Sequence, residues 1–382
     1  KLRFPGFDKP WQSTLLSSVF TKNTKKNTDG QITNVICNSA KQGLIPQREY
    51  FDKDIANSDN TSGYYIIAEN DFVYNPRKSA DAPYGPISRY KYAEAGIVSP
   101  LYLCFRAKKE INPSFFEWYF RSSAWHRYVY MSGDSGARHD RVSIKDDTFF
   151  AMPINLPSAH EQEHIASFLE RIDQRIEKQR ALVESLKKYK RGVTEAIFTK
   201  DLCFTAMGKP YQQWEQKYIG DVCKIQTGKS NTQDETSQGI YPFYVRSPIV
   251  RKSNRYLLDC EAVLTVGDGV GTGKVFHYVT GKFDLHQRVY AMTDFKIVSG
   301  KYFYYYFSHF FYDRVMRMTA KTSVDSVRYE MIDKMTIQIP CHEEQQQIVS
   351  FLDCLEHRVI EAEKTLNLLE KFKSGCLQQL FI

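Results

Sequence analysis

The feature that most constrains this chain is an internal repeat with a period of 183 residues. Residues 157–199 align without a gap to residues 340–382, and 13 of the 43 aligned positions are identical. The identities cluster near the start of each copy, where both carry a Pro, then Glu-Gln, then Phe-Leu (Pro157/Pro340, Glu161/Glu344, Gln162/Gln345, Phe168/Phe351, Leu169/Leu352). Because a repeat of this length organises the whole chain, the architecture has to be built around it.

Both copies predict a long helix with one apolar stripe. Apolar residues recur at sevens, at Ile165, Ile172, Leu186 and Val193 in the first copy and at Ile348, Leu355, Ala362, Leu369 and Cys376 in the second. This spacing is typical of a coiled coil. Pro157 and Pro340 precede the starts, where proline is tolerated, and Ser158 with Glu161 fits a capping box. One such stripe is equally typical of a bundle core, whereas two copies favour a pair of spacer helices, each about 60 Å long.

The segments outside the repeat differ from it in kind. Residues 1–156 and 201–339 are rich in Tyr, Phe, Gly and Pro, and contain short apolar runs bounded by Gly, Asn and Asp, at 64–68, 96–105, 262–266 and 288–292. Such runs predict strands. Helical insertions are expected around 113–130 and 300–318. The chain is therefore predicted to be an α+β protein with four parts: a β-rich domain (1–156), a helix (157–200), a second β-rich domain (201–339) and a second helix (340–382).

Composition narrows the class of protein. The chain has 382 residues, of which 42% are hydrophobic and 25% are charged, as in an ordinary globular protein. It contains no apolar run near the ~18 residues of a membrane span. Its start, Lys1-Leu2-Arg3-Phe4-Pro5, lacks the apolar region of a signal peptide, and the absence of an initial Met leaves room for an upstream segment. Eight cysteines without metal-ligand spacing predict reduced thiols and a cytoplasmic protein.

The positive charge is confined to particular segments. The net charge of +8 divides into +5 for residues 1–156, +2 for 157–200, +4 for 201–339 and −3 for 340–382. The two β-rich segments together carry +9, which favours a phosphate-binding surface on each. Basic residues gather at 246–255 and in the Gly-flanked stretch 138–141. Arg can pair bidentately with guanine, and His can read other base edges. Scattered, solvated surface charge remains the simpler interpretation of any single Lys.

Searches for catalytic motifs find little. The glycine-rich stretch 267–274 fails as a P-loop, because Asp268 stands where Gly is needed and Val275 where Ser or Thr is needed, and it also fails as a dinucleotide fingerprint. A turn between two strands is the better interpretation. Neither Asn75-Pro76 nor Asn112-Pro113 continues into a base-methyltransferase motif. Glu215-Gln216-Lys217 has the E-x-K form of some nucleases, a tripeptide that also arises by chance. No HExxH is present, and His160 and His164 are expected to be solvated. The sequence favours binding over catalysis.

The whole pattern resembles the specificity (S) subunit of type I restriction–modification systems. The resemblance covers the whole chain. It rests on the variable–helix–variable–helix order, on the two Pro-x-x-x-Glu-Gln-x-x-Ile-x-x-Phe-Leu starts, and on Arg3-Phe4-Pro5-Gly6-Phe7 before Trp11. The stretches 96–100 and 271–275 are also similar to the family. The doubled Glu-Gln start is the specific part of the resemblance, and the glycine-rich turn is not.

The resemblance implies an architecture and a function. The β-rich segments would be target recognition domains, each reading one half of a bipartite, asymmetric DNA sequence. The repeated helices would pack as an antiparallel coiled coil, giving a pseudo-two-fold arrangement and fixing the spacing of the half-sites. Two methyltransferase subunits and the restriction (motor) subunits would dock on this chain. S-adenosylmethionine, ATP and Mg²⁺ would belong to those partners, so that this chain holds no cofactor or metal of its own and is not itself an enzyme.

Within this hypothesis, eight residues are the candidates for DNA contact: Arg138, His139 and Arg141 in the first domain, and Arg246, Arg251, Lys252, Lys274 and Arg288 in the second. Several of them are expected to contact phosphates rather than bases. One alternative is a coiled-coil docking protein whose β-rich domains bind other proteins. A second is a self-contained restriction enzyme, which the missing catalytic motifs disfavour.

Overall fold

The computed structural model describes residues 2–50, 61–133, 140–206, 209–211, 213–269, 271–318 and 326–381. It divides into two compact units, each of which contains one β-rich domain and parts of both long helices. Unit 1 comprises Lys1–Gln179 and Thr365–Ile382, and unit 2 comprises Arg180–Lys364. Among the described residues, no helix is both long and apolar enough to cross a bilayer. All eight cysteines are free thiols.

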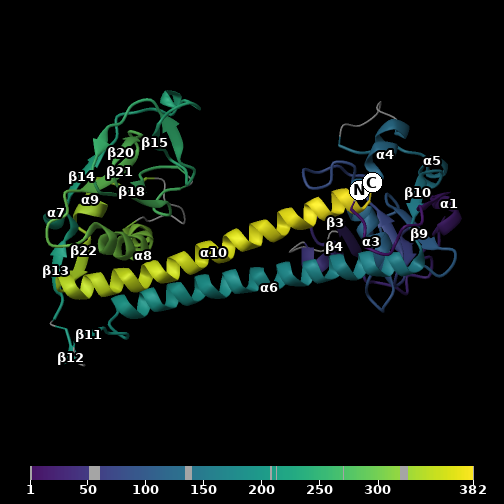
Figure 1. Ribbon diagram of the computed structural model, residues 1–382, viewed down its shortest axis with the longest axis horizontal. Helices are drawn as coiled ribbons and strands as arrows, with labels where there is room; N and C mark the ends of the chain where they lie inside the picture. The colour runs from purple at the N-terminus through teal and green to yellow at the C-terminus, as the bar shows by residue number, and fades with distance from the viewer. Residues whose placement is uncertain are drawn as a thin grey trace. The chain divides into compact units, whose positions relative to one another are not determined.

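The repeat forms the two longest helices, α6 (Ala159–Phe198) and α10 (His342–Leu380). The other elements of unit 1 are β1 (Gln12–Leu15), α1 (Leu16–Val19), β2 (Phe20–Lys22), β3 (Ile36–Ser39), β4 (Gly43–Pro46), α2 (Gln47–Tyr50), β5 (Tyr65–Ile67), β6 (Phe72–Tyr74), β7 (Ile87–Arg89), β8 (Gly96–Val98), β9 (Leu103–Ala107), α3 (Pro113–Arg121), α4 (His126–Ser132), α5 (Asp146–Phe150) and β10 (Pro153–Leu156). Figure 1 shows their arrangement.

Within the described residues, the domain of unit 2 contains more strands than that of unit 1 and one long helix, α8 (Gly300–Met318). Its elements are β11 (Thr205–Ala206), β12 (Lys209–Pro210), β13 (Glu215–Tyr218), α7 (Ile219–Val222), β14 (Lys224–Thr227), the 3₁₀ turn η2 (Thr232–Asp234), β15 (Tyr241–Tyr244), β16 (Arg251–Ser253), β17 (Leu258–Asp259), β18 (Ala262–Val266), β19 (Phe276–Val279), β20 (Lys282–Leu285), β21 (Val289–Thr293), α8 (Gly300–Met318), α9 (Tyr329–Asp333) and β22 (Thr336–Ile339).

The two units share one topology. Unit 1 has a four-stranded antiparallel sheet in the order β2-β9-β6-β7, and unit 2 has β14-β21-β18-β19, with the same connections. In unit 2 a second sheet runs β16-β15-β20-β17, with β15 and β20 parallel. In unit 1 the pairs β3–β4 and β5–β8 are joined by a parallel bridge between Val35 and Ile97 in the corresponding place. The sequences of the two domains hardly match between their ends, yet their strands pair in the same way.

Two predicted elements of unit 1 are each split in two, which corrects the sequence expectation. The predicted strand at 96–105 is the two strands β8 and β9, because Pro100 has no N–H for a ladder and the Tyr102 N–H closes a turn on the Ser99 carbonyl at 3.0 Å. The predicted helix at 113–130 is α3 followed by α4. The Ser122 hydroxyl donates to the Tyr119 carbonyl at 2.6 Å, and the chain leaves the helix in an extended conformation there. The predictions at 262–266 and 300–318 are confirmed as β18 and α8.

In each unit the start of a long helix is attached to its domain by a Trp–Glu hydrogen bond. The Trp11 indole N–H donates to Glu161 Oε1 at 3.2 Å, and the Trp214 indole N–H donates to Glu344 Oε2 at 2.9 Å. Glu161 also accepts from Arg3, at 2.9 Å from both Nε and Nη2. Half of the expected capping box is present, since the Glu161 N–H donates to the Ser158 hydroxyl at 3.3 Å. Both Glu residues are buried, so each repeat begins with a carboxylate used for tertiary contact.

Within each unit the segments of α6 and α10 lie side by side and run antiparallel (Figure 1). In unit 2, Lys187 pairs with Glu363 at 2.9 Å, and Lys190, further along α6, pairs with the earlier Glu356 on α10. In unit 1, Lys373 of α10 pairs with Asp173 of α6. Lys190 and Lys373 are equivalent in the repeat, as are Glu356 and Asp173. The same ion pair therefore occurs once in each unit with the helices exchanged.

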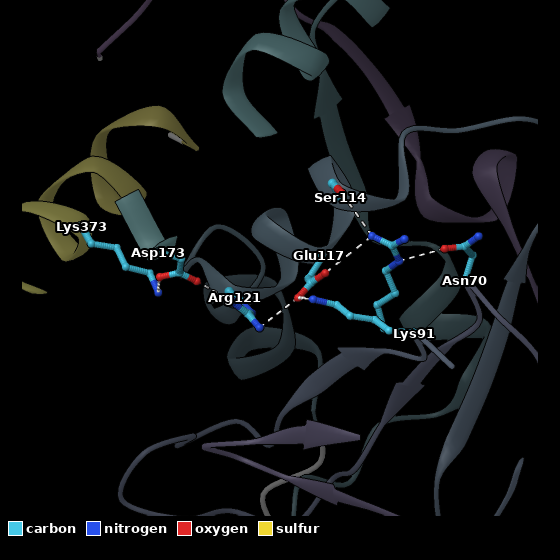
Figure 2. A network of polar contacts seen from close by, with 8 residues as sticks. Asn70, Lys91, Ser114, Glu117, Arg121, Asp173 and Lys373 are labelled. Carbon is cyan, nitrogen blue, oxygen red and sulfur yellow. Dashed lines mark hydrogen bonds and ion pairs between the residues drawn. The ribbon is translucent and has the colours of Figure 1, made fainter. Parts of the chain in front are cut away.

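A polar network fastens the sheet of unit 1 to the helices (Figure 2). At its centre is the buried carboxylate of Glu117 on α3, which pairs with Lys91 at 2.7 Å, Arg121 at 2.9 Å and Arg89 at 3.7 Å. Arg121 continues to Asp173 of α6 at 3.3 Å. Because three cations surround one buried carboxylate, the network fixes α3 between the sheet and α6. The network thereby holds the β-rich domain of unit 1 on α6.

Candidate nucleic-acid interface

In unit 2 several loops leave the sheets at one edge. Strands β15 and β20 are parallel neighbours, with Tyr244 paired to Leu285, so the loops that follow them emerge together. The end of β18 lies there too, because Val266 pairs with Val289 at the start of β21. The unit 2 loop end is defined here as residues 245–250, 267–269, 271–275 and 286–288. It brings together segments that are up to about forty residues apart in the chain.

The corresponding loops of unit 1 meet in the same way. They follow β3, β6 and β8, the counterparts of β15, β18 and β20, and are defined here as the unit 1 loop end: residues 40–42, 75–86 and 99–102. A further segment joins each loop end at an equivalent place. Arg141 forms a β-bridge with Arg77 in unit 1, and Ser326 forms one with Asp268 in unit 2. Each unit thus presents the same four-part surface.

The unit 1 loop end encloses a cavity of about 900 Å³ with a basic lining. Among the described residues that line it, the cations are Lys41, Arg77, Lys78 and Arg141, and the carboxylate is that of Asp81. Lys41 lies 3.5 Å from that carboxylate and is largely exposed. Four cations against one acid make the cavity attractive to a polyanion.

Backbone hydrogen bonds hold the cations of this cavity in place. The Lys78 N–H donates to the Asp140 carbonyl at 2.8 Å, and the Val142 N–H donates to the Pro76 carbonyl at 2.9 Å. These bonds flank the Arg77–Arg141 bridge. The Nε of Arg141 is buried without a hydrogen-bond partner. Its nearest carboxylate is that of Asp140, at 3.8 Å, so among the described residues the Nε–H keeps a hydrogen bond to donate.

The unit 2 loop end centres on one carboxylate and two guanidinium groups. Asp268 Oδ1 lies 3.4 Å from Arg246 Nη1, and Asp268 Oδ2 lies 3.7 Å from Arg288 Nε. The three residues come from three different loops. Both Arg side chains keep about half or more of their surface exposed, at 48% and 64%, whereas Asp268 is at 25%. Each guanidinium therefore retains N–H donors that face solvent.

The glycine-rich turn supports this cluster, which confirms the interpretation of 267–274 as a turn between strands. The Gly267 N–H donates to the Arg288 carbonyl at 2.8 Å, and the Val327 N–H donates to the Gly267 carbonyl at 2.7 Å. A Cβ at Gly267 would stand 2.8 Å from the Arg288 carbonyl oxygen, so this close approach requires glycine. Gly269 has φ +84°, a left-handed conformation that also favours glycine.

His286 is a buried residue of the unit 2 loop end. Burial lowers the pKa of His286, and the nearby Arg246 and Arg288 charges lower it further, while Asp268 opposes them. Its Nδ1 accepts the Arg288 N–H at 3.0 Å. A neutral imidazole can accept this bond, whereas an imidazolium cannot, so the lowered pKa and the hydrogen bond are consistent with each other.

The remaining candidates from the sequence are placed less centrally. Lys274 lies in the same turn, but its ammonium packs over the Tyr312 ring of α8, 5.0 Å from the ring centroid. Arg251 and Lys252 begin the edge strand β16, so the stretch 246–255 is not a single loop as expected. Arg251 pairs with Glu235, and Lys252 is exposed. Arg138 and His139 lie outside the described residues, and Arg141 lines the cavity of the unit 1 loop end.

Sequence reasoning missed the other cations of the unit 1 loop end, Lys41, Arg77 and Lys78. Arg77 and Lys78 directly follow Asn75-Pro76 and form a basic pair just after the strand β6. Two adjacent cations after a strand are a sequence signal for a basic loop. Lys41 stands alone in a short turn between β3 and β4 and carries no such signal. Among the described residues, no group of three or more His, Cys, Asp or Glu side chains is placed to hold a metal ion.

Solved structures with the same fold cover nearly the whole chain. The S subunit of a type I restriction-modification system from M. genitalium aligns with a TM-score of 0.61 at 13% identity, over 100% of this chain and 98% of that one. The HsdS subunit from Thermoanaerobacter tengcongensis aligns with a TM-score of 0.54 at 16% identity, over 99% and 98%. A structure from a study of type I R-M complex assembly and conformational transition gives 0.61 at 18% identity, over 97% of each chain. At these identities the likeness establishes the fold.

Curated relatives match over part of the chain. The EcoDI specificity subunit of Escherichia coli is 26% identical over 174 residues, which are 44% of this chain and 38% of that protein. The MjaVIII specificity subunit of Methanocaldococcus jannaschii is 25% identical over 182 residues, 44% of this chain and 42% of that protein. The matches thus span about two fifths of each relative's length.

The family model for the type I restriction modification DNA specificity domain matches this chain twice, at residues 9–187 and 211–371. Each match contains one β-rich domain and most of the long helix that follows it. Two matches of one model agree with the duplicated topology of units 1 and 2. The chain therefore belongs to the family of type I restriction modification DNA specificity domains.

Proposed function

We propose that this chain is the DNA sequence-specificity subunit of a type I restriction–modification complex, and that its two loop ends each read one half of a bipartite target. The observation that carries the proposal is that cations stand at the loop end of each unit, and that in both units they follow two equivalent strands, β3 or β15 and β6 or β18. Lys41, Arg77 and Lys78 do so in unit 1, and Arg246 and Lys274 in unit 2, while Arg141 and Arg288 add a cation from a further segment of each unit. Randomly placed surface cations would not gather at the same edge of the fold in both units.

The two loop ends differ in the groups that they present, which supports an asymmetric target. Unit 1 offers a cavity with four cations around one carboxylate, Asp81. Unit 2 offers two guanidiniums held by a central carboxylate, Asp268. Since base identity is read by the pattern of donors and acceptors, two different patterns imply two different half-sites.

The repeated helices would serve as docking sites for two copies of one partner. Tyr189 on α6 and Phe372 on α10 are equivalent positions of the repeat, and each has 54% of its surface exposed. Equivalent exposed aromatics on related surfaces suit two equivalent contacts. We assign these to two methyltransferase subunits, to which restriction (motor) subunits would be added. S-adenosylmethionine, ATP and Mg²⁺ would be bound by those subunits and not by this chain, which acts without catalysis of its own, in the cytoplasm.

Salt-dependent duplex binding tests the proposal. The full chain should bind a 30-base-pair duplex with affinity that falls by at least ~10-fold between about 50 and 200 mM salt, because contacts to phosphates release counterions. Replacing Arg246 by Ala should weaken cognate binding, whereas Lys282→Ala, which removes a cation from the far end of β20, should not. A chain that binds duplex weakly and without salt dependence would support the alternative, a docking protein with protein-binding domains.

The proposal that this chain acts without catalysis of its own can be tested separately. Supplied with S-adenosylmethionine and duplex DNA, the purified chain alone should transfer no methyl group. Methylation by the chain alone would contradict a non-catalytic role and favour a self-contained enzyme.

A further inference from the structure

A surface that only attracts phosphates would not be expected to contain a carboxylate such as that of Asp268. It comes from the turn after β18 and stands between Arg246, from the loop after β15, and Arg288, from the loop after β20. It lowers the positive charge of the three-residue cluster from two to one. A surface selected only for phosphate affinity would omit such a group, because phosphates repel it.

The backbone around the cluster is fixed on both sides of Arg288. Its carbonyl accepts the Gly267 N–H at 2.8 Å, and its N–H donates to the neutral imidazole of His286 at 3.0 Å. Asp268 is fixed as well, through its bridge to Ser326 and the bond from Val327 to the Gly267 carbonyl at 2.7 Å. The backbone positions of Arg288 and Asp268 are thus set by tertiary hydrogen bonds, and the Asp268 carboxylate lies within ion-pair distance of both guanidiniums.

A carboxylate-held guanidinium is suited to reading a base. The five N–H donors of Arg lie in one plane, so a contact to Asp268 on one side leaves donors on the other side free for a ligand. Two parallel N–H groups match O6 and N7 of guanine in the major groove, and this bidentate contact needs a fixed orientation. A phosphate, in contrast, can be neutralised by a mobile cation. The arrangement therefore fits base readout better than phosphate binding.

We propose that Asp268 is a positioning residue that orients Arg246 and Arg288 toward two guanines in the half-site read by unit 2. The inference rests on the proposed function and adds to it the base class and the residues that read it. Asp268 itself contacts neither base nor phosphate, but acts through the two Arg side chains. It follows that removing its charge should reduce discrimination between sequences while leaving non-specific affinity intact or higher.

The test selects duplexes from a library with a random 20-base-pair centre, using the full chain and then its variants. The wild-type chain should enrich a two-part sequence in which one half contains two guanine positions. Asp268→Asn should lower the preference for guanine at both positions by roughly 5- to 100-fold, whereas Arg246→Lys should lower it at one position only. In both variants the other half of the sequence should be unchanged. Affinity for a duplex lacking the enriched sequence should be equal to or above wild type for Asp268→Asn.

The matched control is Asp259→Asn, which makes the same charge change on β17, paired with Lys282 at the opposite end of β20. It should leave the enriched sequence unaltered. If Asp268→Asn keeps the full guanine preference, or if no guanine position depends on Arg246 or Arg288, the inference is wrong although the proposed function stands. A variant that loses specific and non-specific binding together indicates a merely structural role and also overturns it. If the wild-type chain enriches no sequence at all, the proposed function itself fails.

Discussion

The Trp–Glu pair at the start of each long helix explains why the repeat keeps its Glu. Trp11 with Glu161 and Trp214 with Glu344 occupy the same place in units 1 and 2, and both carboxylates are buried. Their electrostatic surroundings differ, however. Glu161 also receives two hydrogen bonds from Arg3. For Glu344, burial raises the pKa, and this outweighs the lowering by Trp214 and Lys200. The buried negative charge is thus well compensated at Glu161 in unit 1 and less well at Glu344 in unit 2.

Replacing Glu344 by Gln should reduce the pH dependence of stability. Because its folded pKa is raised above the ordinary value of 4.5, Glu344 contributes most to stability below that value. The contribution is lost as pH rises through the folded pKa. Urea unfolding of Glu344→Gln should therefore show a smaller decline in the free energy of unfolding above pH 4.5 than wild type. The exposed neighbour Glu343→Gln is the control, and equal slopes for wild type and Glu344→Gln would refute the assignment.

At the scale of elements, the sequence was informative wherever a pattern is local. The heptad stripes predict α6 and α10, and the aromatic run predicts α8 at its observed bounds. The splits at Ser99–Tyr102 and Ser122 depend on single side-chain and turn contacts that periodicity does not detect. The loop ends could not be predicted, because they result from pairings such as Tyr244 with Leu285 that join distant segments. Of the candidates chosen by charge, Arg141, Arg246 and Arg288 lie at the loop ends, whereas the placement of Lys41 and Asp268 there became visible only in the fold.

The exposed aromatics of the helices give a prediction at this scale. Tyr189→Ala and Phe372→Ala should each weaken the binding of one methyltransferase subunit, and the double variant should weaken both, because the two positions are equivalent in the repeat. Loss of an exposed aromatic anchor costs on the order of 2 kcal/mol, or roughly 30-fold in affinity. Mass measurement of the assembled complex by light scattering provides the readout. Tyr130→Ala, an exposed aromatic of the unit 1 domain, is the control; unchanged stoichiometry in the double variant would exclude this surface.

On the scale of the whole molecule, the chain is one domain-and-helix unit used twice with diverged loops. The shared strand pairing, the exchanged Lys–carboxylate pairs and the two matches to one family model all reflect the duplication. A framework kept constant around two different loop ends allows each to change its ligand without altering the other. Part of the net charge of +8 is placed at two equivalent edges, because cations of each β-rich domain lie at its loop end.

The most direct test of this account is to map methylated bases in the genome of a host carrying the chain and its partner subunits. The wild-type chain should give one bipartite, asymmetric motif with a constant spacer. Changing Arg246 and Arg288 to Ala should relax one half of that motif and leave the other half and the spacer as they were. A contiguous motif, or simultaneous change of both halves, would contradict the claim that the two units read DNA independently.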